Sequence, residues 1–173
     1  TRSSANGLAW TRSIFWLKDG LFVVADDMTC EQAGDYQTNC TWRFAMQGHL
    51  EGDRYTARDL DRTMVIVGDG TGQSKAAWER HTGELPAHAI RQVVSRKMSP
   101  GDGFAYANVL AWPEHAEDAP TIEKVAEQAW RVTRDGEKTP YLCGSPRAPP
   151  GSMTTRRVIS RARDWKSAQA SLS

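Results

Sequence analysis

Apolar and polar side chains alternate along the chain between Tyr36 and His49. One parity holds Tyr36, Thr38, Cys40, Trp42, Phe44 and Met46. The other parity holds Gln37, Asn39, Thr41, Arg43, Gln47 and His49, interrupted by Ala45. Successive side chains of a strand point to opposite faces, so this pattern predicts a half-buried strand. A helix would spread the same aromatic residues around its whole circumference. One face of the predicted sheet therefore meets solvent, as antiparallel sheets commonly do.

Several other segments are typical of strands separated by turns. The runs Gly7–Leu17 and Leu21–Ala25 flank Lys18-Asp19-Gly20, and Asp-Gly between two β-rich runs is a strong hairpin signal. Further strands are predicted at Asp61–Val67, Ala89–Met98, Phe104–Trp112 and Tyr141–Cys143. The Phe104–Trp112 run is apolar on both parities apart from Asn108, which predicts a central strand covered on both faces.

This succession of short strands predicts an all-β fold, an antiparallel β-sandwich. The segment Ile122–Thr133 stays ambiguous, because its apolar spacing fits either a short helix or a strand near Trp130. We assign residues 1–145 to the sandwich and residues 146–173 to a linker and a basic C-terminal tail. The tail is expected to dock as one strand or to fray.

Charge is unevenly distributed over the chain. The net charge is +1, but the segment from Arg147 onward has six basic residues and one acid, which leaves −4 for the remainder. The tail lacks the interleaved aromatics of a nucleic-acid site, so nucleic acid is not the expected partner. No apolar run approaches the ~20 residues of a membrane helix, so no membrane partner is expected. The chain opens with Thr1 and without a signal-peptide pattern, which suggests a processed protein or an excised fragment.

Patterns for catalysis or metal binding are weak. The cysteines Cys30, Cys40 and Cys143 match no zinc spacing. Cys30 and Cys40 either face each other across neighbouring strands or are buried reduced thiols. The glycine loop Val67–Lys75 fails both the dinucleotide and the P-loop patterns, so it predicts a surface turn.

Acidic residues and histidines add no recognisable site. Asp19, Asp26 and Asp27 have the spacing of no known cation loop. The four histidines, His49, His81, His88 and His115, are scattered along the chain. We therefore predict no catalytic residue, no metal and no cofactor.

One series in the first fifty residues has a familiar form. It runs Trp10-x-Arg12-x-Ile14-x-Trp16, then Gly20-x-Phe22-Val23-Val24-x-Asp26, and after a polar gap Tyr36 and Thr41-Trp42. The series resembles the C-terminal β-sandwich of heparinase II/III-like polysaccharide lyases over about residues 8–48, with looser agreement at Phe104–Leu110. Where a histidine often follows the tryptophan in that family, this chain has Arg43.

The resemblance implies an extracellular or periplasmic sugar-processing enzyme in which a helical toroid precedes β-sheet layers. No long helical array occurs in this sequence, and none of the family's catalytic tyrosine, asparagine and histidines has a matching position here. The implied function is therefore the non-catalytic β-sandwich portion of a secreted polysaccharide-lyase-like enzyme. It would pack on a helical domain of the same parent protein. Whether this chain has enzymatic activity stays open.

Tryptophans and polar strand residues give the candidate glycan site. Sugars stack their C–H faces on tryptophan, while amide and guanidinium groups bind their hydroxyls and carboxylates. The predicted substrate-binding residues are Arg43, Gln47, Asn39 and Trp78. Arg43 is expected to contact a carboxylate of an acidic polysaccharide, and Trp78 is expected to be exposed in a polar loop. The other well-patterned tryptophans, Trp10, Trp42 and Trp112, are expected in the core.

Two other function classes stay open. The chain could be a stand-alone structural or protein-interaction β-sandwich module that holds a partner through a sheet face or through the tail. It could also be an independent enzyme, in which two or more histidines would have to meet the aspartates in one pocket.

Overall fold

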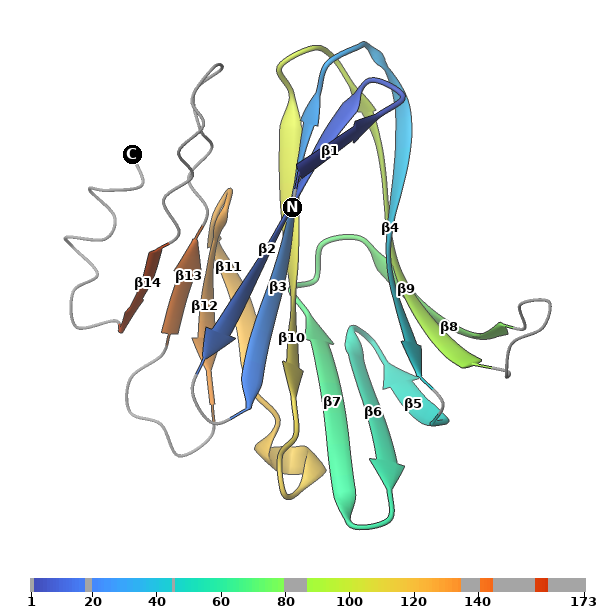
Figure 1. Cartoon of the computed structure of the whole chain (residues 1–173), viewed down its shortest axis with the longest axis vertical. Coiled ribbons are helices and arrows are strands. Elements are labelled where there is room, and N and C mark those ends of the chain that lie inside the picture. The colour runs from blue at the N-terminus through green and yellow to red at the C-terminus, as the bar shows by residue number, and fades with distance from the viewer. Residues whose placement is uncertain are drawn as a thin grey trace.

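Three antiparallel sheets make up the part of the protein that the structure describes, and the predicted all-β sandwich class is confirmed. The computed structural model describes residues 2–17, 20–44, 46–79, 87–134, 141–144 and 158–161. Within these ranges the only helix is a short 3-10 turn, Ala116–Asp118, in the acidic loop after the predicted Phe104–Trp112 strand. Figure 1 shows the largest sheet between the two smaller ones.

Seven strands form the central sheet in the order β1-β2-β3-β10-β7-β6-β5. Their bounds are β1 Arg2–Ala5, β2 Leu8–Leu17, β3 Leu21–Cys30, β5 Gly48–Glu51, β6 Arg54–Asp59, β7 Arg62–Gly68 and β10 Gly103–Ala111. Asn6 and Gly7 connect β1 to β2 and both have positive φ, as a two-residue hairpin turn requires. Strand β10 lies inside the sheet and is buried on both faces, as its sequence predicts.

Two smaller sheets complete the fold. One has the order β4-β9-β8, with bounds β4 Gly34–Phe44, β9 Ala87–Met98 and β8 Gln73–Glu79. The other has the order β11-β12-β13-β14, with bounds β11 Thr121–Ala126, β12 Ala129–Thr133, β13 Tyr141–Gly144 and β14 Val158–Arg161. The helical alternative for Ile122–Thr133 is therefore wrong, because β11 and β12 form a hairpin there. Residues 158–161 of the basic tail dock as a strand on β13, and the linker 146–152 lies outside the described residues.

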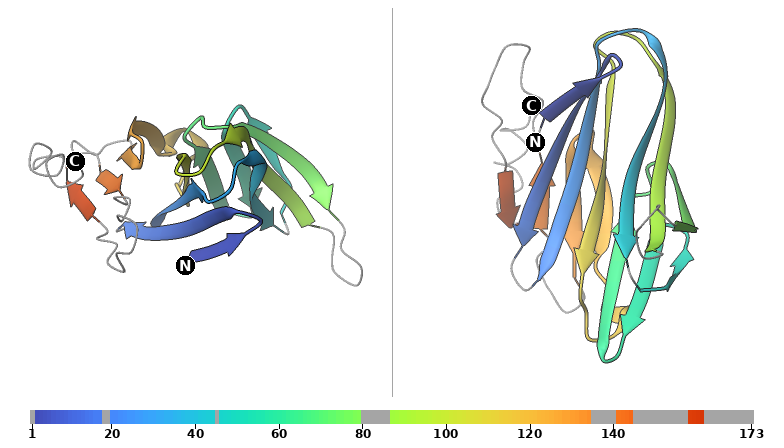
Figure 2. Two further views of the ribbon diagram at one scale, coloured as in Figure 1. Left: turned by 90° about the horizontal axis from the view of Figure 1, so that it is seen from above. Right: turned by 45° about the vertical axis from the view of Figure 1, so that its right-hand side comes forward.

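The central sheet is the middle of three layers (Figure 2). On one side Phe15, Val23 and Ala107 pack against Trp130 and Val132 of β12. On the other side a second cluster joins the central sheet to the β4–β9–β8 sheet, with Met28, Cys30, Phe104 and Tyr106 facing Cys40, Val94 and Met98. A third cluster joins β6 and β7 to β9 through Tyr55, Ile66 and Ile90. Each fully buried large apolar side chain contributes about 1.5–3 kcal/mol relative to exposure.

The alternation that predicted β4 is confirmed. Cys40 is buried and Trp42 packs into the core, whereas Asn39 and Arg43 are exposed. The strand is shorter than predicted, however, because it ends at Phe44 and the separate strand β5 starts at Gly48. Met46 and Gln47 continue the period of two but lie between the two strands.

Three further expectations need correction. Trp112 is 48% exposed, so it is not a core residue, while Trp10 and Trp42 pack against the core as expected. Trp78 lies in strand β8 and not in a loop. Cys30 and Cys40 are buried free thiols on different sheets, so the disulfide alternative is wrong.

Candidate functional site

The outward side of the β4–β9–β8 sheet carries the polar parity of β4, and we call it the outer face. In this antiparallel register Gln37 lies opposite Ser95, and Asn39 lies opposite Val93. Directly opposed residues share one face, so these positions form rows across the three strands. The Gln37 amide donates to the Ser95 hydroxyl at 3.3 Å, which ties β4 to β9 at the surface.

Three cations gather on the outer face. Arg91 of β9 lies between Thr41 of β4 and Lys75 of β8 in one row, and Arg43 lies one row further along β4. The side chains of all three cations are exposed. Neighbouring strands are ~4.8 Å apart and successive rows ~6.6 Å apart, so these charges lie within reach of one anionic polymer.

The charge on this face is of one sign over its central part. From the Gln37–Ser95 row to the Arg43–Ala89 row, the outer-face positions of the three strands include no carboxylate. Amide groups from Gln37, Asn39 and Gln73 lie among the cations and are exposed. Such a surface offers hydrogen bonds to hydroxyls and ion pairs to carboxylates.

The four residues predicted as a binding site separate in the structure. Asn39 and Arg43 lie on the outer face as expected. Gln47 is exposed but lies in the connection between β4 and β5, outside the sheet. Trp78 pairs with His88, and His88 in turn pairs with Phe44, so Trp78 occupies a position of the parity opposite to that of Arg43.

Sequence reasoning missed two cations of this face, Arg91 and Lys75. The Ala89–Met98 strand was predicted, but its pairing with β4 was not, so nothing brought Arg91 next to Arg43. Lys75 lies on β8, a strand that was not predicted. The only available signal was the mixed polarity of Gln73–Glu79, which is weak.

A second polar constellation lies between the central sheet and β4. Asp26 is 0% exposed, and its carboxylate accepts hydrogen bonds from Arg12 Nε at 2.7 Å, Arg12 Nη2 at 2.9 Å and Trp10 Nε1 at 2.9 Å. Arg12 also stacks on Trp10, with its guanidinium carbon 4.9 Å from the ring centre. These are the arginine and the aspartate of the series that resembles the lyase family, and their contacts hold β2 and β3 in register.

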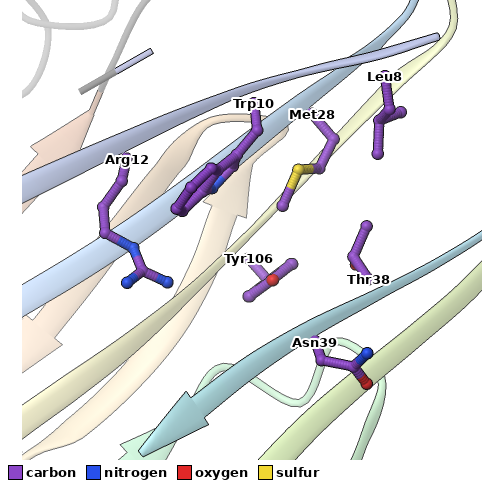
Figure 3. A pocket seen from close by; sticks show the side chains of 7 residues that line it. All are labelled: Leu8, Trp10, Arg12, Met28, Thr38, Asn39 and Tyr106. Carbon is purple, nitrogen blue, oxygen red and sulfur yellow. The ribbon is translucent and has the colours of Figure 1, made fainter. Parts of the chain in front are cut away.

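A pocket of about 210 Å³ opens beside this ion pair, between β2, β3, β10 and β4 (Figure 3). Its lining residues are Leu8, Trp10, Arg12, Met28, Thr38, Asn39 and Tyr106. The Thr38 hydroxyl is buried with no hydrogen-bond partner within the described part of the chain. The volume is below the ~300 Å³ of ordinary small-molecule sites, so it suits one small group.

Arg12, Cys40 and Tyr106, three titratable groups around the pocket, are held protonated. Burial raises the pKa of the Cys40 thiol to about 12, and the charge of Asp26 adds to the rise while Arg12 opposes it. Burial, followed by the charge of Asp26, raises the pKa of Tyr106 above its usual range. The hydrogen bond to Asp26 raises the pKa of Arg12, so the guanidinium stays charged. This pocket therefore presents hydrogen-bond donors, and neither Cys40 nor Tyr106 is an anionic nucleophile near neutral pH.

The glycine loop after β7 forms a connection between the central sheet and β8, as predicted. Its Asp69 has a structural role. One oxygen, Oδ2, accepts from the Ala107 amide at 2.9 Å and from Trp130 Nε1 at 2.7 Å, and Oδ1 accepts from the Thr71 amide at 3.0 Å. Through Ala107, the carboxylate gives β10 a hydrogen-bond acceptor at the point where β7 no longer pairs with it. Through Trp130, it joins β12 to the central sheet.

Buried amides and a tyrosine–histidine pair complete the polar interior. Asn108 donates to Gln92 Oε1 at 2.8 Å, and Gln92 donates to the Thr71 carbonyl at 2.9 Å. Tyr55 and His88 are buried and joined by a 2.8 Å hydrogen bond between Oη and Nδ1. Each of these buried polar side chains has a hydrogen-bond partner in the interior, so together they stabilise the contacts between layers.

The part of the chain that the structure describes was searched for metal ligands and for membrane helices, and it holds neither. Within the described ranges, no three acidic, histidine or cysteine side chains come together as metal ligands. In the same part of the chain, no helix has the length and hydrophobicity that crossing a bilayer requires. No protein-family model and no curated protein sequence matches this chain.

Proposed function

We propose that this chain is the non-catalytic β-sandwich part of a secreted polysaccharide-lyase-like protein, and that its outer face binds an acidic glycan. The observation that carries the proposal is the row of Arg91 and Lys75, with Arg43 one row away, on an exposed sheet face without carboxylates at its centre. A flat, preformed surface of this kind loses little conformational freedom on binding. The proposal includes an extracellular or periplasmic location and a helical domain of the same parent protein as a packing partner.

Uronic acid polymers have the chemistry that fits this surface. Their carboxylates pair with guanidinium and ammonium groups, and their hydroxyls match the amides of Asn39 and Gln37. Arg43 is the residue that we expect to contact a carboxylate. The pKa values of Cys40 and Tyr106 are raised by burial, so the cation that the pocket offers to a ligand, the Arg12 guanidinium, has no anionic thiolate or phenolate beside it near neutral pH.

Titration calorimetry of the chain with a uronic acid oligosaccharide tests the proposal. We expect binding that weakens as salt rises from about 0.05 to 0.3 M, because salt screens the attraction between exposed cations and the carboxylates of the glycan. Arg43→Ala and Lys75→Ala should each weaken binding about threefold to tenfold, since one charge-assisted contact is lost. Arg62→Ala is the matched control, because Arg62 is exposed on β7 of the central sheet and should not contact the glycan.

A neutral glucose oligosaccharide of the same length should bind much more weakly, and a lyase assay on the chain alone should detect no unsaturated product. Equal affinity for the neutral and the acidic oligosaccharide would contradict the proposal. So would an Arg43→Ala variant that binds like the wild-type chain while Arg62→Ala binds less well.

A protein-interaction module is the second candidate function. It is favoured by the exposure of Ile14 and Trp16 on β2 and of Trp112 after β10. A chain that ignores both oligosaccharides and binds a polypeptide would support this alternative.

A further inference from the structure

The pocket beside Arg12 has an apolar side and a polar side. Leu8 and Trp10 of β2 and Met28 of β3 line one side, and Thr38 and Asn39 of β4 lie opposite them (Figure 3). The leucine, indole and thioether groups offer mainly apolar contact area, whereas the hydroxyl and the amide of β4 both donate and accept hydrogen bonds. A ligand that fits this pocket therefore has an apolar body and a polar group at one end.

The walls of the pocket are strands that are already paired. Strands β1 and β3 lie on the two sides of β2 from Leu8 to Thr11, the stretch that carries Trp10. Strand β10, which carries Tyr106, pairs with β3, and β4 pairs with β9 over its whole length. A ligand thus meets preformed walls, which lowers the conformational cost of binding. Because β4 is the outer strand of its sheet, the pocket lies at the border between two layers, where a small molecule can enter.

Charge at the pocket is compensated within the protein. Arg12 is the only charged side chain among the described lining residues, and it forms a two-point ion pair with Asp26, which is 0% exposed. A ligand carboxylate would lose its water close to the buried Asp26 charge, which costs more free energy than the already paired guanidinium can offset. The guanidinium still attracts an uncharged oxygen or an aromatic ring. The pocket therefore favours a ligand without net charge.

The Thr38 hydroxyl supplies the polar end of the site. It is buried and has no hydrogen-bond partner within the described part of the chain, although the Tyr106 phenol lies near it (Figure 3). A buried hydroxyl without a partner is costly, and rotation about one side-chain bond can direct it into the pocket. A ligand hydroxyl can accept from Thr38 and donate to the Asn39 amide oxygen, or the reverse. A hydroxyl is thus the ligand group that completes this end.

The volume and the apolar side of the pocket select an aromatic ring over a sugar. The pocket has about 210 Å³, and an apolar protein cavity of ~150 Å³ is large enough to hold benzene. Indole and thioether groups, here those of Trp10 and Met28, make favourable contacts with aromatic rings. A pyranose would also direct hydroxyls at Leu8 and Met28, where no partner could replace the water that they lose. One ring with one hydroxyl matches both sides of the pocket.

We propose that this pocket binds a small uncharged phenol, with its ring against Trp10 and Met28 and its hydroxyl directed toward Thr38 and Asn39. This ligand differs in class from the acidic glycan, and Asn39 is the one residue that we name for both. The pocket lies between β4 and the central sheet, whereas the glycan surface is the outer face on the other side of β4. The two proposals can therefore fail independently.

Titration with p-cresol, followed by NMR of the full chain, tests this assignment. The reporter is the indole N–H of Trp10, which donates to Asp26 beside the pocket at 2.9 Å. The control reporter is the indole N–H of Trp130, which donates to Asp69 and lies on the opposite side of the central sheet. We expect the Trp10 signal to shift with a dissociation constant on the order of 0.1–1 mM, typical of a ligand with about eight non-hydrogen atoms, while the Trp130 signal stays in place.

Three further probes separate the parts of the ligand. Toluene has the same ring and methyl group without the hydroxyl, so it should bind about fivefold to tenfold more weakly. p-Toluate has a carboxylate in place of the hydroxyl and should bind at least about tenfold more weakly. N-acetyltyrosinamide presents the phenol on a peptide backbone. Affinity equal to that of p-cresol would assign the site to a tyrosine side chain of a polypeptide, and weaker binding would assign it to a free phenol.

Thr38→Val removes the hydroxyl and keeps the shape of the side chain. The affinity for p-cresol should fall about threefold to tenfold, while the affinity for toluene should not fall. Thr63→Val is the matched control, because the Thr63 hydroxyl is also buried without a partner in the described part of the chain but lies on β7, outside the pocket. Both variants should be as stable to urea as the wild-type chain, since neither loses a hydrogen bond of the described structure.

A second variant fills the pocket instead of changing its chemistry. Leu8→Trp places a larger side chain on the apolar side and should reduce the affinity for p-cresol at least about tenfold. Leu60→Trp is its control, because Leu60 is 93% exposed in the β6–β7 turn and its replacement should leave the affinity unchanged.

The outcomes decide the proposal in either direction. Saturable binding of p-cresol at Trp10, weakened by Thr38→Val and not by Thr63→Val, supports it. A Trp10 signal that does not move in about 5 mM p-cresol would overturn it, since the dissociation constant would then lie far above the expected range. Equal or tighter binding of toluene or of p-toluate would also overturn it.

Discussion

Arg12 and Asp26 face each other across β2 and β3 and form a two-point ion pair, with Nε to Oδ1 at 2.7 Å and Nη2 to Oδ2 at 2.9 Å. The two partners differ in environment. The Asp26 side chain is 0% exposed, whereas that of Arg12 is 32% exposed. Removing the arginine therefore leaves a buried, uncompensated carboxylate, while removing the aspartate leaves a cation that can turn to water.

We predict that Arg12→Met lowers the free energy of unfolding by about 3–5 kcal/mol and that Asp26→Asn lowers it by less. Urea unfolding followed by circular dichroism measures both. Arg131→Ala is the control, since the Arg131–Glu123 pair is exposed and its loss should change stability by less than about 1 kcal/mol. Equal effects for Arg12→Met and Arg131→Ala would show that the buried pair has no special role in stability.

Asp69→Ala should detach the β11–β14 sheet locally from the central layer. The substitution removes the acceptor for Trp130 Nε1 and for the Ala107 amide, and Trp130 is only 1% exposed. We expect a loss of about 2–4 kcal/mol, because buried donors without partners carry a desolvation cost. The indole N–H resonance of Trp130 should shift upfield in NMR spectra.

Asp102→Ala is the comparison for this change. Asp102 accepts one amide hydrogen bond, from Ser99 at 2.7 Å, in an exposed turn. Its loss should cost about 1 kcal/mol or less, since water can replace the acceptor. Similar losses for the two variants would contradict a structural role for Asp69 between the layers.

The strands that sequence reasoning could predict are those with a clear period. Tyr36 to Phe44 alternates because one face of β4 packs on the core and the other meets solvent, and Phe104 to Ala111 is apolar on both parities because sheets cover both its faces. Strands β5, β6 and β8 were not predicted. They are short or carry mixed polarity, since β5 and β8 are the outer strands of their sheets and β6 lies next to β5, where coverage is less complete.

The candidate site was predictable only within one strand. Arg43 and Asn39 share a parity of β4, and parity is a local property of sequence. The neighbours Arg91 and Lys75 join them through pairings of β4 with β9 and of β9 with β8. Arg91 is 50 residues from its partner Thr41, and a pairing over that distance leaves no trace in local pattern. The exposure of Trp112 was unpredictable for the same reason, because it depends on where the β4–β9–β8 sheet stops covering β10.

Tyr106 makes stability sensitive to alkaline pH. Burial, followed by the charge of Asp26, raises the pKa of its phenol above the ordinary value near 10. In the unfolded chain the phenol ionises near pH ~10, while the folded protein keeps it neutral, so its contribution to stability is present below pH ~10 and is lost as pH rises further. Tyr106→Phe should therefore lose less stability between pH ~9 and ~11.5 than the wild-type chain does.

Urea unfolding at a series of pH values measures this difference. Tyr55 serves as a comparison, since burial also raises its pKa and Tyr55→Phe should flatten the same limb. A wild-type curve and a Tyr106→Phe curve that run parallel above pH 10 would contradict the prediction.

Cys40 should resist alkylation while the protein is folded. Burial, helped by the charge of Asp26, raises the pKa of its thiol to about 12. At pH ~8 only about one thiol in ten thousand is then ionised, compared with about a quarter for a free cysteine of pKa ~8.5. Burial of the sulfur, at 2% residue exposure, further slows attack by the reagent.

We expect iodoacetamide to label Cys40 at least a thousandfold more slowly than it labels the thiol introduced by Ser95→Cys, on the exposed outer face of neighbouring β9. Peptide mapping by mass spectrometry over time measures both rates in one molecule, and urea should bring them together. Rates within tenfold of each other in the folded protein would mean that the interface between β4 and the central sheet opens far more often than its packing implies.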